Sequence, residues 1–211
     1  MSKVEEKHEI TLKLLSAVEV SSHITQRAVA SELGIALGLV NTYLKRCVKK
    51  GLIKIRQVPA NRYAYYLTPE GFSEKARLTT EYLTQGFQLF RLSRNQLLEI
   101  LKKCESLKHK KIILYGLSDI AEIAVLCAQE FDLEIVGIID GNSPVKKYSN
   151  INILKKLDKG LNFDSVVVTD TNDPVEKVKY LEGVVESSRI FTPDILKVAA
   201  NYDQQVGKTW S

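Results

Sequence analysis

Basic side chains gather in one part of the chain. Eight lie between residues 25 and 66, where Glu32 is the single acidic residue. They are Arg27, Lys45, Arg46, Lys49, Lys50, Lys54, Arg56 and Arg62. Ammonium and guanidinium groups at this density attract a polyanion, because they neutralise phosphates and release the counterions around them. A basic face that contacts only solvent is the alternative interpretation.

The charge is divided unevenly between the two halves of the 211 residues. Residues 1–110 carry 19 Lys and Arg against 10 Asp and Glu, a net +9. Residues 111–211 carry 11 against 15, a net −4. A chain of this length with ordinary globular composition predicts two domains, of which the first is the one suited to a polyanion.

The cysteines and the N-terminus indicate the compartment. Cys47, Cys104 and Cys127 lie in apolar, helix-like patterns, which favours buried thiols over disulfides or a zinc site. The chain has no apolar run as long as a membrane span, and its N-terminus lacks the apolar region of a signal peptide. We therefore expect a cytoplasmic protein with no membrane partner.

The basic region lies within a pattern of three helices. Apolar residues recur at three- and four-residue steps over residues 5–21, which predicts a first amphipathic helix. Thr25 is suited to cap a second helix, and Gly34 to end it in the left-handed conformation. A third helix is expected over about residues 36–50, followed by Gly51. Two helices joined by a short turn with glycine form a helix-turn-helix, whose second helix enters the major groove of DNA.

The third helix carries the side chains that would read bases. Those expected to face outward are Leu37, Asn41, Thr42, Lys45, Arg46 and Lys49. Asn41 can pair with adenine, Lys45 or Arg46 can donate to guanine, and Thr42 or Leu37 can contact a thymine methyl group. Thr25, Gln26 and Arg27, at the start of the preceding helix, are expected to contact phosphates and so set the register.

A basic hairpin is expected after the third helix. Residues 52–58 and 63–67 are rich in β-branched and aromatic types, and residues 59–62 form the turn between them. This hairpin would be the wing of a winged helix, with Arg56, Asn61 and Arg62 placed to follow the DNA backbone or reach the minor groove.

These motifs resemble a known family. The segments TQRAVASELGIALGLVN and YYLTPEGFSEKARLT, within about residues 8–95, resemble winged-helix regulators of the MarR type, and most of all the group associated with exopolysaccharide gene clusters. The resemblance implies recognition positions at Leu37, Asn41, Thr42 and Lys45 and a wing with Arg56, Asn61 and Arg62. It also implies a homodimer on a palindromic operator and surface-polysaccharide genes as targets. This chain departs from the short members of that group, because it continues into a second domain where they stop.

A long helix is expected between the domains. Thr68 and Pro69 provide an N-cap and a first-turn proline, and the helical pattern then extends to about residue 107, with Gly86 in its interior. Apolar or small residues follow it at alternating three- and four-residue steps. This seam suits a dimerisation helix that sets the two recognition helices about 34 Å apart. A helix that packs on its own domains is the alternative.

The second half alternates strands with helices. Apolar runs at residues 111–116, 133–140, 165–169 and 189–192 predict strands, and residues 120–127, 154–157 and 175–181 predict helical stretches. Such alternation predicts a parallel sheet with a Rossmann-like plan, in which a ligand binds at the carboxyl ends of the strands.

Loop residues at that edge are candidates for ligand binding. They are Gly116, Ser118, Asp119, Ile120, Asp140, Thr169, Asp170 and Thr171. The dinucleotide fingerprint is incomplete, because Ser118 stands where its second glycine would be, whereas Asp140 occupies the place of the ribose-binding acid. The segment KIILYGLSDIAEIAVLCAQEFDLEIVGIIDGN resembles Rossmann-like domains of sugar acyltransferases and nucleotide-sugar dehydratases, and the two-domain plan is similar to that of Rex repressors. The effector is thus unknown, with a nucleotide or nucleotide-sugar as the candidate.

Catalysis has little support in the sequence. His8, His23 and His109 all lie outside the expected strand ends, no nucleophile accompanies them, and no metal-ligand spacing occurs. We expect an α/β multidomain transcription regulator that binds double-stranded DNA as a homodimer. Its parts would be a winged helix-turn-helix at residues 1–70, a linker helix at 71–109 and a Rossmann-like domain at 110–211. The alternatives are a nucleotide-sugar enzyme tethered to DNA and an assembly module.

Overall fold

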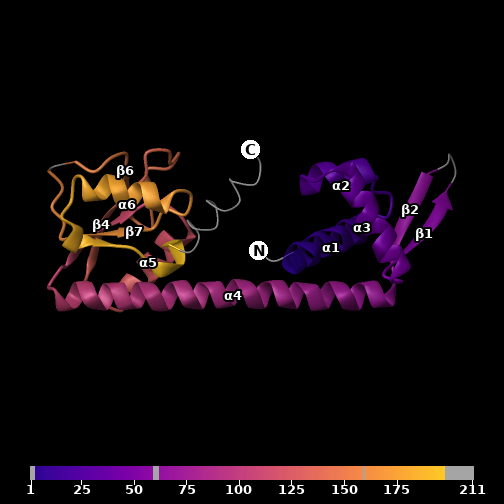
Figure 1. The fold of residues 1–211 in the computed structure, drawn as a ribbon, viewed down its shortest axis with the longest axis horizontal. Coiled ribbons are helices and arrows are strands. Elements are labelled where there is room, and N and C mark those ends of the chain that lie inside the picture. The colour runs from indigo at the N-terminus through magenta and orange to yellow at the C-terminus, as the bar shows by residue number, and fades with distance from the viewer. Residues whose placement is uncertain (1–2, 59–61, 159, 198–211) are drawn as a thin grey trace. The chain divides into compact units, whose positions relative to one another are not determined.

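The structure is a computed structural model and describes residues 3–58, 62–158 and 160–197. The chain divides into two compact units, Met1–Phe87 and Gln88–Ser211, and each is described by itself. The boundary between the units falls inside one long helix (Figure 1). The three-part domain division expected from the sequence stays a prediction.

The first unit contains three helices and a hairpin, as expected. The helices are α1 (Lys3–Val20), α2 (Gln26–Leu33) and α3 (Leu37–Lys49). The Thr25 side chain accepts a hydrogen bond from the Ala28 amide, and Gly34 ends α2 with φ of 63°. These two devices satisfy backbone groups that the ends of α2 would otherwise leave unpaired. Apolar side chains of all three helices form one buried core.

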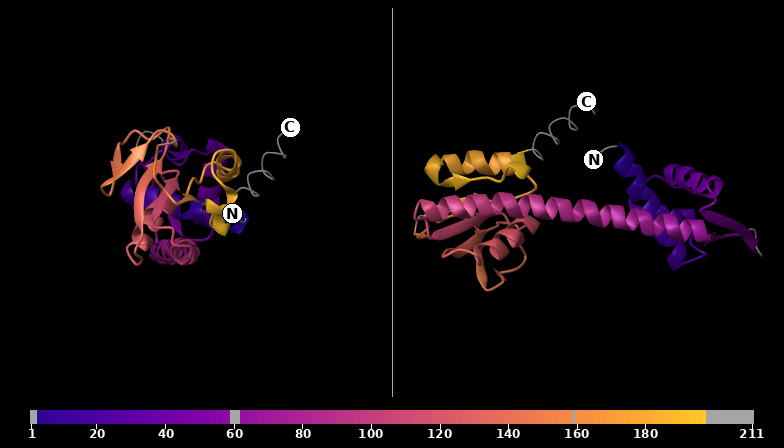
Figure 2. Two further views of the ribbon diagram at one scale, coloured as in Figure 1. Left: turned by 90° about the vertical axis from the view of Figure 1, so that its left-hand side faces the viewer. Right: turned by 90° about the horizontal axis from the view of Figure 1, so that it is seen from below.

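The hairpin forms the wing of a winged helix. Strands β1 (Ile53–Val58) and β2 (Arg62–Leu67) pair antiparallel, with Ile55 opposite Tyr65. The Tyr65 amide donates to the Ser22 carbonyl, which joins β2 to the loop between α1 and α2. The hairpin projects from the helices of this unit (Figures 1 and 2).

Helix α4 (Pro69–Ser106) is continuous through Gly86. Thr68 fixes its start, because the Thr68 hydroxyl donates to the Gly51 carbonyl and accepts from the Gly71 amide at 3.0 Å. The His8 Nδ1 lies 3.1 Å from the Glu81 carboxylate, so the first half of α4 is attached to α1.

The second unit is a mostly parallel sheet. Its strands are β3 (Lys111–Tyr115), β4 (Glu134–Ile139), β5 (Lys147–Tyr148), β6 (Ile151–Leu154), β7 (Ser165–Val168) and β8 (Ile190–Phe191). The order is β5-β6-β4-β3-β7-β8, and only β5 is antiparallel to its neighbour. The five parallel strands therefore have the order of a doubly wound α/β sheet, with the change of direction between β3 and β7.

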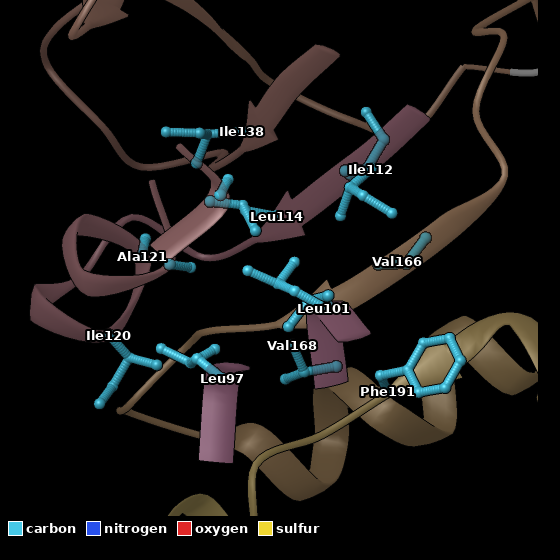
Figure 3. Close-up of a cluster of buried hydrophobic side chains, with 14 of the residues drawn as sticks. Leu97, Leu101, Ile112, Leu114, Ile120, Ala121, Ile138, Val166, Val168 and Phe191 are labelled. Carbon is cyan, nitrogen blue, oxygen red and sulfur yellow. The ribbon is translucent and has the colours of Figure 1, made fainter. Parts of the chain in front are cut away.

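Helices cover both faces of this sheet. Helix α6 (Pro174–Glu182) contacts β7 and β8, and its Tyr180 ring lies 6.1 Å from that of Tyr115. Helix α4 lies on the opposite face, together with α5 (Asp119–Ala128) (Figure 1). Leu97 and Leu101 of α4 are fully buried among the side chains of the sheet (Figure 3). The last third of α4 is therefore part of this core.

One prediction for the second unit is wrong. The sequence predicted a helical stretch at residues 154–157, but Ile151–Leu154 is strand β6, which pairs with β5. Ser149 and Asn150 join the two strands with φ of 45° and 67°. This is the left-handed geometry of a two-residue hairpin turn, which outweighs the weak helical pattern after it.

Candidate nucleic-acid interface

Helix α3 separates apolar from basic side chains. Val40, Tyr43, Leu44 and Cys47 are buried and hold one side of α3 against the unit. On the other side, the exposed residues are Leu37, Thr42, Lys45, Arg46 and Lys49, and Asn41 is half-exposed. The structure thus brings the six expected recognition residues onto the outward side of one helix.

The basic groups of α3 remain available for a partner. Among the residues that the structure describes, no ion pair involves Lys45, Arg46 or Lys49. The Arg46 guanidinium lies 5.3 Å from the centre of the Tyr43 ring, a cation–π contact that limits its rotamers. Burial raises the pKa of the neighbouring Cys47 thiol to about 11, against the opposing effect of Lys50 and Arg46. Cys47 is therefore neutral and leaves the positive field of α3 intact.

The side chains of the three residues at the start of α2 make different contacts. Thr25 uses its hydroxyl oxygen to cap the helix. The Gln26 Nε2 donates to the Tyr65 hydroxyl at 3.1 Å, so the Gln26 side chain connects α2 to the wing. Arg27 is exposed. Arg27 is accordingly the freest of the three to reach a phosphate, and the role of Gln26 is partly structural.

The wing adds a second row of cations. Lys54 and Arg56 are exposed and lie two residues apart, which places both on one face of β1. Lys54 was counted in the basic region but not among the residues expected to contact DNA. The alternation of side chains along β1, which places Lys54 on the same face as Arg56, could have included it. Arg62 begins β2, where it pairs with Val58, but its side chain lies outside the described part of the chain, as does Asn61.

The expected ligand residues of the second unit lie at the carboxyl edge of the sheet, where they bond to one another and to neighbouring loop amides. The Ser118 hydroxyl donates to the Thr169 carbonyl, and the Thr169 hydroxyl donates to the Gly116 carbonyl, each at 2.5 Å. Asp140 and Asp170 each accept two amides of the loop that follows them. The Ser118 and Thr169 bonds join the loops after β3 and β7, whereas these Asp140 and Asp170 bonds each lie within one loop.

Gly116 has a structural reason to be glycine. Its φ is 105°, and a Cβ at this position would lie 2.5 Å from the Cα of Asp170. The close approach that Gly116 permits is therefore to the Asp170 backbone, at the point where a doubly wound sheet usually holds its ligand. Asp119 and Thr171 are exposed beside it, whereas Ile120 is buried.

Metal-binding clusters and membrane-spanning helices are both absent from the described residues. No group of three or more His, Cys, Asp or Glu residues in that part of the chain could hold a metal ion. No helix there is long and apolar enough to cross a membrane.

Comparison with known families supports the first unit's class. Residues 7–54 match the family of winged helix-turn-helix DNA-binding domains. The match begins in α1 and ends in β1, so it includes the helix-turn-helix and the first wing residues. This part of the chain is therefore a winged helix-turn-helix DNA-binding domain.

Similarity to solved structures and curated sequences is limited. A solved structure that resembles the chain is the complex of S. aureus MepR with DNA, at 22% identity and a TM-score of 0.34. The alignment spans 42% of this chain and 62% of the MepR chain, and a likeness this slight supports no argument about function. Curated protein sequences contain no significant match.

Proposed function

We propose that the protein is a sequence-specific, non-enzymatic transcription regulator that binds double-stranded DNA through α3 and the wing. The observation that carries this proposal is the outward side of α3, where Asn41 lies among basic groups without ion-pair partners. Asn41 would read an adenine, and Lys45 or Arg46 a guanine. Arg27, Lys54 and Arg56 would hold the flanking phosphates.

The wing would extend the footprint of this unit. Arg56 together with Asn61 and Arg62 would contact the backbone or the minor groove, while Leu37 and Thr42 would meet thymine methyl groups. The resemblance to MarR-type regulators of the exopolysaccharide group makes surface-polysaccharide genes the proposed targets.

A homodimer formed through α4 is part of the proposal. Large apolar side chains in the middle of α4 are between 40% and 60% exposed, namely Tyr82, Leu83, Phe87, Leu89, Phe90 and Leu92. All but Leu92 lie, with Gly86, on one arc of about 160° at 3.6 residues per turn. Leu97, Leu101 and Cys104 continue the same side of the helix, and there the sheet buries them.

A second α4 would bury this exposed stretch. Residues 82–90 contain no charged side chain, and a Cβ at Gly86 would meet nothing within 4 Å, so another helix could approach closely. Exposed apolar patches of this kind mark interaction sites. A two-fold axis at this α4 interface would relate the two recognition helices of the dimer. The two half-sites of a palindromic operator are related by the same symmetry.

The second unit would sense an effector and transmit its presence through α4. A ligand changes operator affinity only when it binds the DNA-competent arrangement with a different free energy. Helix α4 suits this role, because its first half is attached to α1 by His8 and Glu81 and its last third lies in the core of the second unit. A nucleotide or nucleotide-sugar at the Gly116 and Asp140 loops is the effector proposed from the sequence.

Binding of a DNA duplex across a salt series tests the proposed function. The duplex from upstream of the protein's own gene is compared with a scrambled duplex of equal length. We expect tighter binding to the upstream duplex and a steep fall of affinity with salt, because several phosphates are neutralised. Equal, weak binding to both duplexes at low salt would contradict the proposal.

A further inference from the structure

A shallow apolar groove of about 310 Å³ lies beside α6 in the second unit. Pro174, Val175 and Val178 of α6 form one wall, and Thr192 and Leu196, which follow β8, form the other. Lys179 and Lys197 also line the groove. The volume is at the lower end of the range for small-molecule sites.

The chemistry of this lining is selective. Among the described lining residues, four side chains are apolar, one offers a hydroxyl group, and two carry ammonium groups. None of the lining residues that the structure describes carries a carboxylate, although residues 111–211 as a whole have a net charge of −4. The Lys197 ammonium pairs with Asp194 at 2.7 Å, but both groups are well exposed, and surface pairs of this kind exchange partners easily. The groove therefore favours an apolar molecule that carries negative charge.

The position of the groove also suits a ligand. Pro174 begins the helix that follows β7, and Thr192 comes directly after β8, so the groove lies toward the carboxyl ends of these strands. Parallel sheets bind ligands at this edge. At the usual position between β3 and β7, the Gly116 backbone lies against Asp170. The groove is one strand further along the same edge.

A hydrogen bond connects the groove wall to the long helix. The Ile195 amide donates to the Gln96 side-chain oxygen of α4 at 2.9 Å. Ile195 adjoins Leu196, which lines the groove. A molecule that displaces Leu196 would therefore move the residue bonded to α4.

We propose that this groove binds a small amphiphilic anion, an apolar chain or ring with one carboxylate, as an effector of the protein. The apolar part lies against Val175, Val178 and Leu196, and the carboxylate accepts hydrogen bonds from the Lys179 ammonium and the Thr192 hydroxyl. The effector role rests on the proposed function, whereas binding in the groove does not.

Titration calorimetry of the full chain, without DNA, tests the site. The probes are octanoate, octan-1-ol and octylamine, which share one apolar chain and differ in charge. Octanoate is expected to saturate one site per chain and to bind about tenfold more tightly than octan-1-ol, since a charge-assisted hydrogen bond is lost in the alcohol. Absence of octanoate binding, or equal affinities for octanoate and octan-1-ol, would overturn the proposal.

Variants separate this groove from a general effect of charge. Lys179→Gln should weaken octanoate about tenfold and leave octan-1-ol unchanged. Lys177→Gln removes the same charge from the same helix at a residue that does not line the groove, and it should leave octanoate binding unchanged. Equal losses in the two variants would overturn the assignment to the groove.

The effector role has its own readout. Octanoate should shift the affinity of the wild-type protein for the upstream duplex and leave that of Lys179→Gln unchanged at the same concentration. Binding of octanoate with no shift would overturn the effector role. Loss of specific DNA binding by the protein without octanoate would instead contradict the proposed function, so the two failures are distinguishable.

Discussion

The backbone of Gly71 lies against the carbonyl group of Leu52. Gly71 is in the first turn of α4, and Leu52 comes directly before β1 of the wing, so the contact sets where α4 leaves the winged helix. A Cβ on Gly71 would overlap the Leu52 carbonyl oxygen, which already accepts a hydrogen bond from the Thr68 amide. Only glycine fits this approach.

Gly71→Ala should therefore lower the free energy of unfolding of the first unit. Forced overpacking of backbone costs about 1–3 kcal/mol or more. Urea unfolding followed by circular dichroism measures the loss. Gly38→Ala is the matched control, because a Cβ at Gly38 of α3 meets nothing within 4 Å and should leave stability equal or slightly raised. An unchanged stability in Gly71→Ala would contradict the contact.

Phe90→Glu should convert the proposed dimer to a monomer. The substitution places a carboxylate on the apolar arc of α4, where a second copy would have to desolvate it. Sedimentation velocity measures the change. Gln88→Glu adds the same charge to the polar side of the same helix turn and should leave the dimer intact. A monomeric wild-type protein, or equal effects of both variants, would refute the α4 interface.

The three cysteines should be unreactive in the native protein. All are buried, and burial raises the pKa of Cys47 to about 11 and raises the pKa of Cys104 and Cys127 as well. Thiolate, the reactive form, is therefore scarce at neutral pH. A thiol reagent such as Ellman's reagent should label none of them at pH 8 and all three in denaturant.

The same burial makes stability depend on alkaline pH. In the unfolded chain Cys47 loses its proton near its ordinary pKa of 9.0, while the folded protein keeps it up to about 11. The folded state then binds more protons, so stability should fall as pH rises between these values. Cys47→Ala should reduce this fall in urea titrations. An undiminished slope in the variant would exclude Cys47 as its source.

Asp164 should stabilise the second unit through two backbone bonds. Its Oδ2 accepts from the amides of Lys111 and Lys110, at 2.8 and 2.7 Å, and these bonds lower the pKa of the carboxyl group. Because folding lowers this pKa, the stabilisation is complete at pH values above the ordinary pKa of the carboxyl group. It is lost as the pH falls through the pKa of the folded protein. Asp164→Asn should cost about 1–2 kcal/mol at pH 7. Asp158→Asn, at an exposed pair with Lys156, is the control and should change little.

Local signals accounted for much of the fold. The Thr25 cap, the left-handed Gly34 and the wing hairpin were predicted, because each depends on a few neighbouring residues. Residues 154–157 were wrongly predicted as helix, since a short apolar run has no distinctive period. The Ser149 and Asn150 turn was the local signal that could have corrected it.

Contacts between distant residues could not be predicted from such signals. The Gln26 side chain donates to the hydroxyl of Tyr65, 39 residues away, and no neighbouring residue indicated this contact. Gly116 was predicted only as a candidate ligand-binding residue, and its close approach to Asp170 had no local signal. The groove at α6 was missed for the same reason, because its two walls come from residues 174–179 and 192–197. Periodicity indicates which side of an element is apolar, but not which segment covers it.

The most direct test of the account compares Asn41→Ala with the wild-type protein on the upstream and scrambled duplexes at one salt concentration. Loss of a base contact should weaken binding to the upstream duplex by about 1–3 kcal/mol and leave the scrambled duplex nearly unchanged. Arg56→Ala, which removes an expected phosphate contact, should weaken both duplexes alike. An equal loss on the two duplexes for Asn41→Ala would contradict sequence reading by α3.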